Sequence, residues 1–458
     1  SITDEITLRT CSFRITRPEF CMHKGTTLFS TKPFAFVLNS DYINERCDNC
    51  LKSGKLFKCS ACQYVYYCDR NCQKEAWRVH KTECGNLKRI APKIVPDMVR
   101  LMARIIVKLK HGGSEEVGYY SETGSRKFKD LMSHYSDIKK DEQRMQHFTC
   151  LCGVLFEFLG DIHMPNIAEL MGIYGRICIN SFNIFDLDMK SIGVGIYLGP
   201  SILDHSCKPN AISVFDGPNI IIRTIEDIPQ LDWSQIRISY IDVLQTAKAR
   251  CEELKKSYYF WCDCEKCTQP EPIEVEAAAC PNKSCTYPCS PDSDKCQDCG
   301  AKFPSQFKET FDEVSEFTKL RLQEMQNVAY LDVCKICLKK QDGVLHRLNV
   351  QHVKTLEDAY NAALKLNCWE EAESYALRLL PGYLLYYGEI HSVTGLLYLE
   401  MGKIQLYLEN YKDSLDSLQK ASMILTITHG EKHSLLQEIL KPLLFQATMY
   451  NMAIKGCS

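Results

Sequence analysis

The sequence contains no long apolar run, no excess of one charge and no leader-like beginning. None of its 458 residues lies in an apolar stretch of about eighteen or more, so we expect no transmembrane helix. The 55 basic and 57 acidic residues leave a net charge of −2, which gives no reason to expect a general binder of nucleic acid or membranes. The opening residues, SITDEITLRTCSF, lack the basic and then apolar pattern of a signal peptide. We therefore expect the protein in the cytoplasm and the nucleus.

Cysteine, in contrast, is abundant. The chain has 26 cysteines, and many of them fall in closely spaced pairs. In a chain without a leader, such pairs indicate metal binding rather than disulfides, and zinc is the metal that we expect. Apolar residues make up 45% of the chain, so real cores can form, and the length suits about two to four domains.

The first cluster offers eight ligands within residues 47–84. Cysteines two apart can reach one ion from a tight turn, and ligands four apart lie on one face of a helical turn. Because each zinc takes four ligands in a tetrahedron, the cluster predicts about two zinc ions. In the interleaved arrangement, the first ion is held by Cys47, Cys50, Cys68 and Cys72, and the second by Cys59, Cys62, His80 and Cys84.

The second cluster is one ligand short. The stretch WCDCEKC supplies Cys262, Cys264 and Cys267, and the missing ligand is Cys207 in DHSCKPN. A cysteine so near a histidine is also the pattern of a thiolate nucleophile. The three unpaired thiolates downstream favour a structural zinc ligand instead.

A third cluster lies between residues 270 and 304. Its spacing predicts a small zinc ribbon held by Cys280, Cys285, Cys296 and Cys299. Cys289 is either spare or an alternative ligand. Cys334 and Cys337 have no partner pair, and we interpret them as helix residues of the C-terminal region.

The remaining chain alternates between strand-like and helical patterns. Residues 1–45 and 176–247 carry short runs of β-formers, such as TTLFST, GVGIYL and NIIIRTI. Residues 96–173, and all residues from about 307, show apolar residues at helical spacing. The segments WEEAESYALRLL and YKDSLDSLQKAS begin 42 residues apart and resemble each other. They fit a tetratricopeptide-like (TPR-like) array and a plain helical bundle about equally well.

Two sets of motifs resemble known families. CDNC, KCSAC, YYCDRNCQKEAW and HKTEC are similar to a MYND zinc finger. HSCKPN, ISYID, NSF and YYFWCDCEKC resemble the SET core and post-SET segment of the SET-and-MYND (SMYD) protein-lysine methyltransferases. The resemblance covers nearly the whole chain and implies an α+β fold. The implied division is N-terminal part of SET, 1–45; MYND finger, 46–86; helical insert, 87–175; SET core, 176–247; post-SET zinc segment, 248–270; zinc ribbon, 271–305; and helical TPR-like C-terminal domain, 306–458.

The resemblance also implies an activity and its residues. The activity is methyl transfer from S-adenosylmethionine to a protein lysine, which must lose its proton in a narrow apolar channel. Tyr240 would stand at the point of transfer. Phe182, Tyr258 and Phe260 would line the lysine channel or the adenine site. The cofactor would contact Asn180, Asp204 and His205. About four zinc ions and S-adenosylmethionine are thus the expected cofactors.

Three departures from the family pattern support an alternative. Residues 13–20 carry no glycine where the family has a glycine-rich cofactor loop, and Asp204 replaces an asparagine. The sequence LDWSQIR at 231–237 replaces a glycine–glutamate–glutamate turn. The alternative is therefore a weak or inactive scaffold that binds protein partners through the MYND finger and the helical domain. In either case we expect a monomer with protein or peptide partners, and nucleic acid is not an expected partner.

Overall fold

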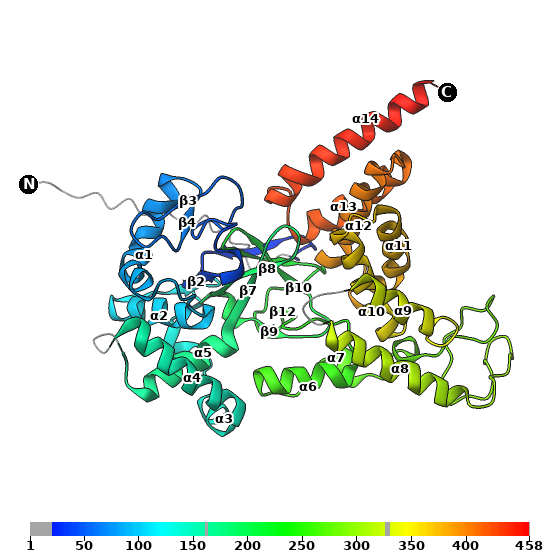
Figure 1. The fold of residues 1–458 in the computed structure, drawn as a ribbon, viewed down its shortest axis with the longest axis horizontal. Coiled ribbons are helices and arrows are strands. Elements are labelled where there is room, and N and C mark those ends of the chain that lie inside the picture. Colours follow the sequence, from blue (N-terminus) through cyan, green and yellow to red (C-terminus); the bar gives the residue numbers. More distant parts are fainter. Residues whose placement is uncertain (1–20, 161–163, 326–329, 458) are drawn as a thin grey trace, which may run out of the picture. The chain divides into compact units, whose positions relative to one another are not determined.

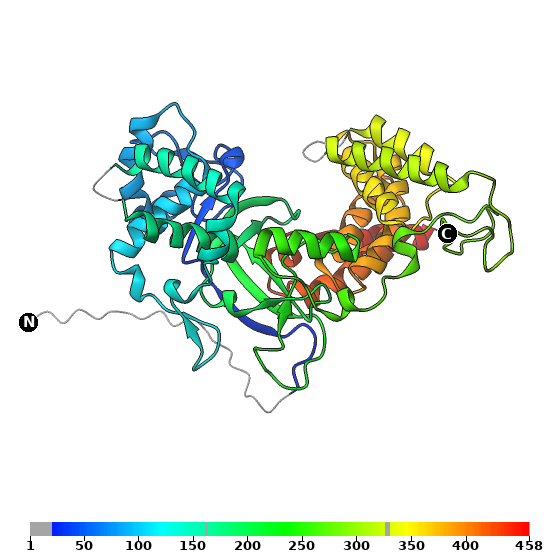
Figure 2. The same cartoon turned by 90° about the horizontal axis from the view of Figure 1, so that it is seen from below.

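The computed structural model describes residues 21–160, 164–325 and 330–457, and divides into two compact units. Unit 1 comprises the chain up to Asp186 together with Lys190–Asp204 and Ser213–Ile236. Unit 2 comprises Leu187–Met189, His205–Ile212 and the chain from Arg237 onward. Within the described residues, no helix combines the length and apolarity that a membrane crossing requires. Figures 1 and 2 show the ribbon in two orientations.

The sheets of unit 1 consist of short antiparallel strands, as their runs of β-formers predict. One three-stranded sheet has the order β2 (Ala35–Leu38), β8 (Ser191–Ile196), β7 (Ser181–Phe185). Another has the order β1 (Thr27–Thr31), β11 (Asn219–Thr224), β10 (Ala211–Asp216). Two small hairpins pair β3 (Phe57–Lys58) with β4 (Tyr66–Tyr67), and β5 (Gly118–Tyr119) with β6 (Ser125–Arg126).

The helices of unit 1 pack together beside these sheets (Figure 1). They are α1 (Arg70–Ile90), α2 (Asp97–Lys110), α3 (Tyr135–Lys140), α4 (Glu142–Leu159) and α5 (Ile167–Asn180). Side-chain caps set the starts of α1, α4 and α5, and at α4 the Asp141 side chain accepts the backbone N–H of Arg144. The Asp69 side chain accepts from the backbone N–H of Cys72 at α1, and the Asn166 side chain accepts from two backbone N–H groups at α5.

A buried ionic cluster fastens α2 to the cysteine-rich segment. Arg100 and Arg104 lie four residues apart on α2 and are 1% and 8% exposed. Both donate to the carboxylates of Asp48 and Glu83, at 2.7–3.2 Å. Arg104 also donates to the carbonyl oxygen of Phe36 in β2, at 2.6 Å. Two cations and two anions balance, so no buried charge is left uncompensated.

Unit 2 joins a small strand pair to a stack of helices. β9 (Asp204–His205) pairs with β12 (Arg237–Ile238). The helices are α6 (Ala247–Tyr258), α7 (Glu265–Thr268), α8 (Phe307–Glu324), α9 (Leu331–Gln341), α10 (Val350–Lys365), α11 (Trp369–Tyr386), α12 (Ser392–Tyr407), α13 (Tyr411–Thr428) and α14 (Lys441–Cys457). From α8 to α14 successive helices pack on one another, and a π-helical turn, Leu435–Leu440, precedes α14.

The 42-residue resemblance in the sequence corresponds to a structural repeat. Helices α11 and α13 begin at matching residues, Trp369 and Tyr411. Two residues before each start, Asn367 and Glu409 have positive φ angles of 57° and 62°. Past the ends of the helices, Gly388 and Gly430 have φ angles of 88° and 91°, which suit glycine. Helices α11 and α13, together with the turns before and after them, are therefore copies of one structural unit.

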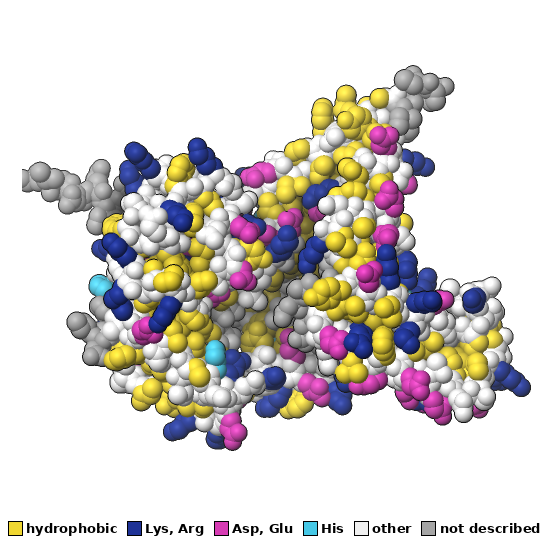
Figure 3. Space-filling view, in the orientation of Figure 1, with side chains coloured by type: hydrophobic (Ala, Val, Ile, Leu, Met, Phe, Trp, Pro, Cys, Tyr) yellow, Lys and Arg dark blue, Asp and Glu magenta, His cyan; other side chains and the backbone are white. Residues whose placement is uncertain are grey.

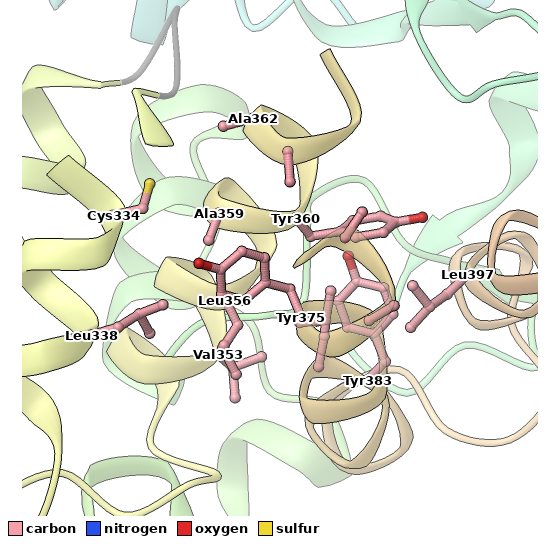
Figure 4. Packing of buried hydrophobic residues seen from close by; sticks show 14 of the residues in the cluster. Cys334, Leu338, Val353, Leu356, Ala359, Tyr360, Ala362, Tyr375, Tyr383 and Leu397 are labelled. Carbon is pink, nitrogen blue, oxygen red and sulfur yellow. The ribbon is translucent and has the colours of Figure 1, made fainter. Parts of the chain in front are cut away.

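The core of this stack lies between α9, α10, α11 and α12. Figure 4 shows Tyr360, Tyr383 and Leu397 directed toward one another, with Leu338 and Cys334 on the side of α9. At the other end of the stack, hydrophobic side chains gather over the exposed face of α14 (Figure 3); the exposed ones are Phe445, Met449, Tyr450 and Met452. The predicted α+β fold, with short strands and an all-helical C-terminal region, is confirmed. The finer division into seven segments stays a prediction.

The buried ionic cluster yields the first prediction. Arg100→Leu leaves the Asp48 and Glu83 carboxylates with too few partners in a dry site, so the free energy of unfolding should fall by about 3–5 kcal/mol. Urea denaturation followed by circular dichroism measures this. The control is Lys93→Ala, which removes the pair of Lys93 with Glu157, side chains 69% and 55% exposed, and should leave the free energy of unfolding almost unchanged. Equal losses in the two variants would contradict the assignment.

Candidate metal centres and active site

The structure brings the predicted metal ligands together in four groups. In each group the four ligand atoms all lie within 4.8 Å of one another. The groups are Cys47, Cys50, Cys68 and Cys72; Cys59, Cys62, His80 and Cys84; Cys207, Cys262, Cys264 and Cys267; and Cys280, Cys285, Cys296 and Cys299. The interleaving of the first two groups is the one that the spacing predicts.

The geometry of these groups fits zinc. The sulfurs of Cys68 and Cys72 lie 3.4 Å apart, and those of Cys207 and Cys262 lie 4.0 Å apart. A tetrahedral zinc with Zn–S bonds of about 2.3 Å separates its sulfur ligands by about 3.8 Å. The cysteines are free thiols, so no disulfide competes for these sulfurs among the residues described. Each group can therefore hold one zinc ion.

The second group shows how the ionic cluster supports a metal site. The Nε2 atom of His80 lies 3.4 Å from the sulfur of Cys59 and 3.5 Å from that of Cys62. Its Nδ1 atom lies 3.3 Å from Oε1 of Glu83. A proton on Nδ1, donated to this carboxylate, leaves the Nε2 lone pair for the metal. Glu83 thus orients a ligand of this group while it pairs with Arg100.

The third group answers the question about Cys207. This residue follows β9 and is 2% exposed, and its sulfur lies 3.5 Å from that of Cys267. It is therefore surrounded by other thiols in a site that water hardly reaches. That environment is typical of a structural metal ligand, whereas a nucleophile needs access to its substrate.

His205 connects this thiol group to Tyr240. The Nδ1 atom of His205 accepts the backbone N–H of Tyr240 at 3.0 Å. Nδ1 therefore carries no proton, so the ring proton is on Nε2, which lies 3.2 Å from the sulfur of Cys207. Burial, aided by the nearby charge of Arg250, lowers the pKa of His205 to about 4, which keeps the ring neutral. Both ring nitrogens are thus engaged within unit 2.

Arg250 is a functional candidate that the sequence analysis missed. Its side chain is buried on α6, and its Nη2 atom lies 3.8 Å from the sulfur of Cys267. Burial opposes its charge, but the bond to Cys267 and the other thiols of the group outweigh burial and raise its pKa. A zinc with four thiolates carries a net charge of about −2, and this guanidinium offsets part of it.

Four of the seven predicted active-site residues form one aromatic group. The ring of Tyr240 lies 5.1 Å from that of Tyr258 and 5.4 Å from that of His205, which in turn lies 6.1 Å from the ring of Phe260. The hydroxyl of Tyr258 donates to the carbonyl oxygen of Tyr240 at 3.4 Å. These rings pack against Cys207 and its partner cysteines.

The other three residues lie in unit 1. Asn180 ends α5, and its Nδ2 atom donates to the carbonyl oxygens of Met132 and Arg176, at 2.7 and 2.8 Å. Phe182, in β7, packs edge-on against Tyr197, with ring centroids 5.7 Å apart. The side chain of Asp204, in β9, is exposed. The roles of all seven residues stay predictions.

The fourth group lies in a segment that is bridged to the residues before α10. Ala278 bridges both Cys289 and Leu345, which precedes α10. Cys289 is buried beside the group but is not one of its four ligands. Cys334 and Cys337 are buried in α9, as predicted.

Two of the three departures from the family pattern, Asp204 and residues 231–237, lie within the described residues. The glycine-free segment 13–20 lies outside the described residues. In 231–237, Trp233 packs edge-on against Phe29 and Tyr120, with ring centroids 5.6 and 5.5 Å apart.

Comparison with known proteins agrees with these observations. Residues 47–84 match the MYND finger family. Histone-lysine N-methyltransferase SMYD3 of Mus musculus is 30% identical over 433 residues, which cover 92% of each chain. Histone-lysine N-methyltransferase ASHR1 of Arabidopsis thaliana is 29% identical over 91% of this chain and 89% of its own. N-lysine methyltransferase SMYD2 of Mus musculus is 26% identical over 91% of this chain and 92% of its own. With four converging metal-ligand groups and a relative this similar along nearly its whole length, the chain belongs to the SMYD family.

Proposed function

We propose that the protein is a SET-type protein-lysine N-methyltransferase that takes its methyl group from S-adenosylmethionine. The observation that carries this proposal is the aromatic group of Tyr240, Tyr258, Phe260 and His205, packed on the third thiol group. The names of the relatives, which are lysine methyltransferases, support it. The methylated protein is unassigned, and we place the activity in the cytoplasm and the nucleus.

The residues of this group suit the chemistry of amine methylation. A lysine attacks only as the neutral amine, and aromatic walls lower its pKa because they exclude the water that stabilises the ammonium form. Tyr240 supplies the hydroxyl dipole near the reacting amine, and Tyr258 and His205 hold the backbone of Tyr240 on both sides. His205 is not the base, since its Nδ1 atom accepts from Tyr240 and its Nε2 proton faces Cys207.

The individual side chains also fit the methyl donor. S-adenosylmethionine supplies a methyl group activated by a positive sulfonium, and carries an adenine and an ammonium group. The ring of Phe260 suits the adenine. Both described bonds of the Asn180 side chain use Nδ2, so its Oδ1 atom is available as an acceptor for the ammonium.

We further propose that each of the four ligand groups binds a structural zinc ion. All four are complete, and none combines three protein ligands with an open position, which is the mark of a catalytic zinc. Metal binding would therefore contribute to folding and not to the methyl transfer itself.

The alternative function, a protein-binding scaffold with little activity, is favoured by one observation. Trp233 fills the segment where the family has a glycine–glutamate–glutamate turn, and it packs edge-on against Phe29 and Tyr120. Without the glycine, this turn loses backbone freedom that the family's turn has. In that case the MYND finger and the helical domain would bind protein partners.

Calorimetry and turnover separate the two functions. We expect S-adenosylhomocysteine to bind with a Kd in the micromolar range, and Asn180→Ala to weaken binding at least tenfold. Tyr240→Phe should reduce transfer of labelled methyl groups to core histones at least about 100-fold and leave the Kd within about twofold. Tyr407→Phe, at a tyrosine that is 68% exposed, is the matched control and should change neither value. No heat at millimolar ligand would favour the scaffold.

Metal analysis tests the four zinc sites. Plasma mass spectrometry of the purified chain should find about four zinc ions per molecule. Cys299→Ser removes one ligand of the fourth group and should lower the content to about three. Cys289→Ser is the control from the same segment and should leave the content unchanged, since Cys289 lies outside the ligand group. A loss of zinc in the control and not in Cys299→Ser would reverse the assignment.

A further inference from the structure

One residue of the helical stack reaches the candidate active-site group. Tyr387, at the C-terminal end of α11, packs in the same cluster as Tyr240, Tyr258 and Phe260. Its hydroxyl donates to Oδ1 of Asp242 at 2.7 Å. Asp242 stands two residues after Tyr240 in ISYID, so this bond joins the helical stack to the segment that carries the candidate reactive tyrosine.

The same oxygen also shapes the backbone of that segment. Oδ1 of Asp242 accepts the backbone N–H of Leu244 at 3.0 Å, which closes a tight turn. The Tyr387 hydroxyl therefore fixes an acceptor that organises the turn immediately after Tyr240. Upstream, the backbone N–H of Tyr240 is already held by His205.

From these contacts we propose that Tyr387 is a positioning residue for the methyl transfer, acting through Asp242 on the backbone around Tyr240. This inference rests on the proposed function. The role is one of orientation, because Tyr387 contacts the segment of Tyr240 and holds its turn in place. A tyrosine of the helical domain would thereby set the geometry of the catalytic segment.

Neighbouring contacts hold Tyr387 and the end of α11 that carries it. The ring of His391 stacks on its ring, with centroids 5.0 Å apart and planes 29° apart. Nδ1 of His391 accepts the backbone N–H of Val393, which fixes the orientation of that imidazole. On the adjacent residue, the carbonyl oxygen of Tyr386 accepts from Nζ of Lys266 at 2.7 Å, and Lys266 lies between two cysteines of the third thiol group. The end of α11 is thus tied to both the turn and the metal ligands.

The electrostatic surroundings keep the Tyr387 hydroxyl a donor. Burial, together with the carboxylates of Asp242 and Glu357, raises the pKa of Tyr387 well above its usual range. The hydroxyl therefore stays protonated and serves as the donor in its bond to Asp242.

The internal repeat shows that the helical fold does not itself require this tyrosine. In the second copy of the repeat, His429 occupies the position of Tyr387, and His433 occupies that of His391. His429 is 7% exposed, and its Nδ1 atom lies 2.9 Å from the hydroxyl of Thr428 within the stack. In the first copy, the matching residue instead extends its hydroxyl to Asp242. The tyrosine serves the junction with the catalytic segment.

Tyr387→Phe tests the inference, with Tyr386→Phe as the matched control. Tyr386 is the preceding residue, and its hydroxyl donates to the carbonyl oxygen of Leu348 within the stack, at 2.8 Å. We expect Tyr387→Phe to lower kcat for histone methylation about tenfold, and to leave KM for S-adenosylmethionine within about twofold. Tyr386→Phe should leave kcat within twofold. Equal kcat values in the two variants would overturn the proposal.

Substitutions of the acceptor, Asp242, test the same hydrogen bond. Asp242→Ala should reproduce the loss, and combining it with Tyr387→Phe should add little, because both changes break one interaction. Asp242→Asn keeps an oxygen acceptor at the same place and should restore at least half of the activity. Because the side chain of Asp242 is exposed, these variants remain usable if Tyr387→Phe does not fold. Fully additive losses would overturn the proposal.

Hydrogen exchange tests the positioning without any need for turnover. In the zinc-loaded protein, the backbone amides of Tyr240 and Leu244 should exchange several-fold faster in Tyr387→Phe and Asp242→Ala than in Tyr386→Phe. If these amides exchange faster in the two variants while the wild-type protein binds no S-adenosylhomocysteine, the proposed activity is refuted and the structural tie is kept. Unchanged exchange in an active protein would refute the tie alone.

Discussion

One thiol group, placed to share a single ion, brings together segments of unit 2 that are far apart in the sequence. Its members are Cys207, Cys262, Cys264 and Cys267. Cys207 lies 55 residues before Cys262, yet their sulfurs are 4.0 Å apart. Bare thiolates at this distance repel each other, and only a cation makes their approach favourable. Since His205 bonds to the sulfur of Cys207 and to the backbone of Tyr240, a metal held by this group would indirectly determine where Tyr240 stands. The aromatic group around Tyr240 therefore depends on ligands that are distant in the sequence.

Buried negative charge lies in or beside the ligand groups of both units, and each unit compensates it with buried arginines in a different way. In unit 2 the buried guanidinium of Arg250 lies beside Cys267 and offsets part of the negative charge of four thiolates. In unit 1 two arginines of α2 neutralise Asp48 and Glu83, which flank the ligands Cys47 and Cys84. The cost of burying these charges is acceptable only because every one of them is paired. Each ionic arrangement therefore links a metal site to a neighbouring helix.

The sequence allowed the metal ligands and the short strands to be predicted, because each follows from local spacing. It also showed the 42-residue resemblance, but left a TPR-like array and a plain helical bundle equally open. The ligands of WCDCEKC and the matching starts at Trp369 and Tyr411 are visible within a few residues. Arg250 and Tyr387 were missed because their partners lie far along the chain. Arg100 and Arg104 did leave a signal, since two arginines four residues apart interrupt the apolar helix MVRLMARIIVKLK. A charge in such a place needs a buried partner, and Asp48 and Glu83 beside metal ligands were the available candidates.

The ribbon segment has four metal ligands but only a small apolar cluster. The cluster within it consists of Cys280, Cys289 and Cys296, with only a few partly buried neighbours such as Tyr287 and Phe303. A segment of this length buries too little apolar surface to offset the conformational entropy of its own backbone. A zinc ion on these four ligands would supply the missing free energy, because a tetrahedral site exists only in the folded segment. Since Ala278 bridges both Cys289 and Leu345, the ion would stabilise the residues before α10 as well as the ribbon.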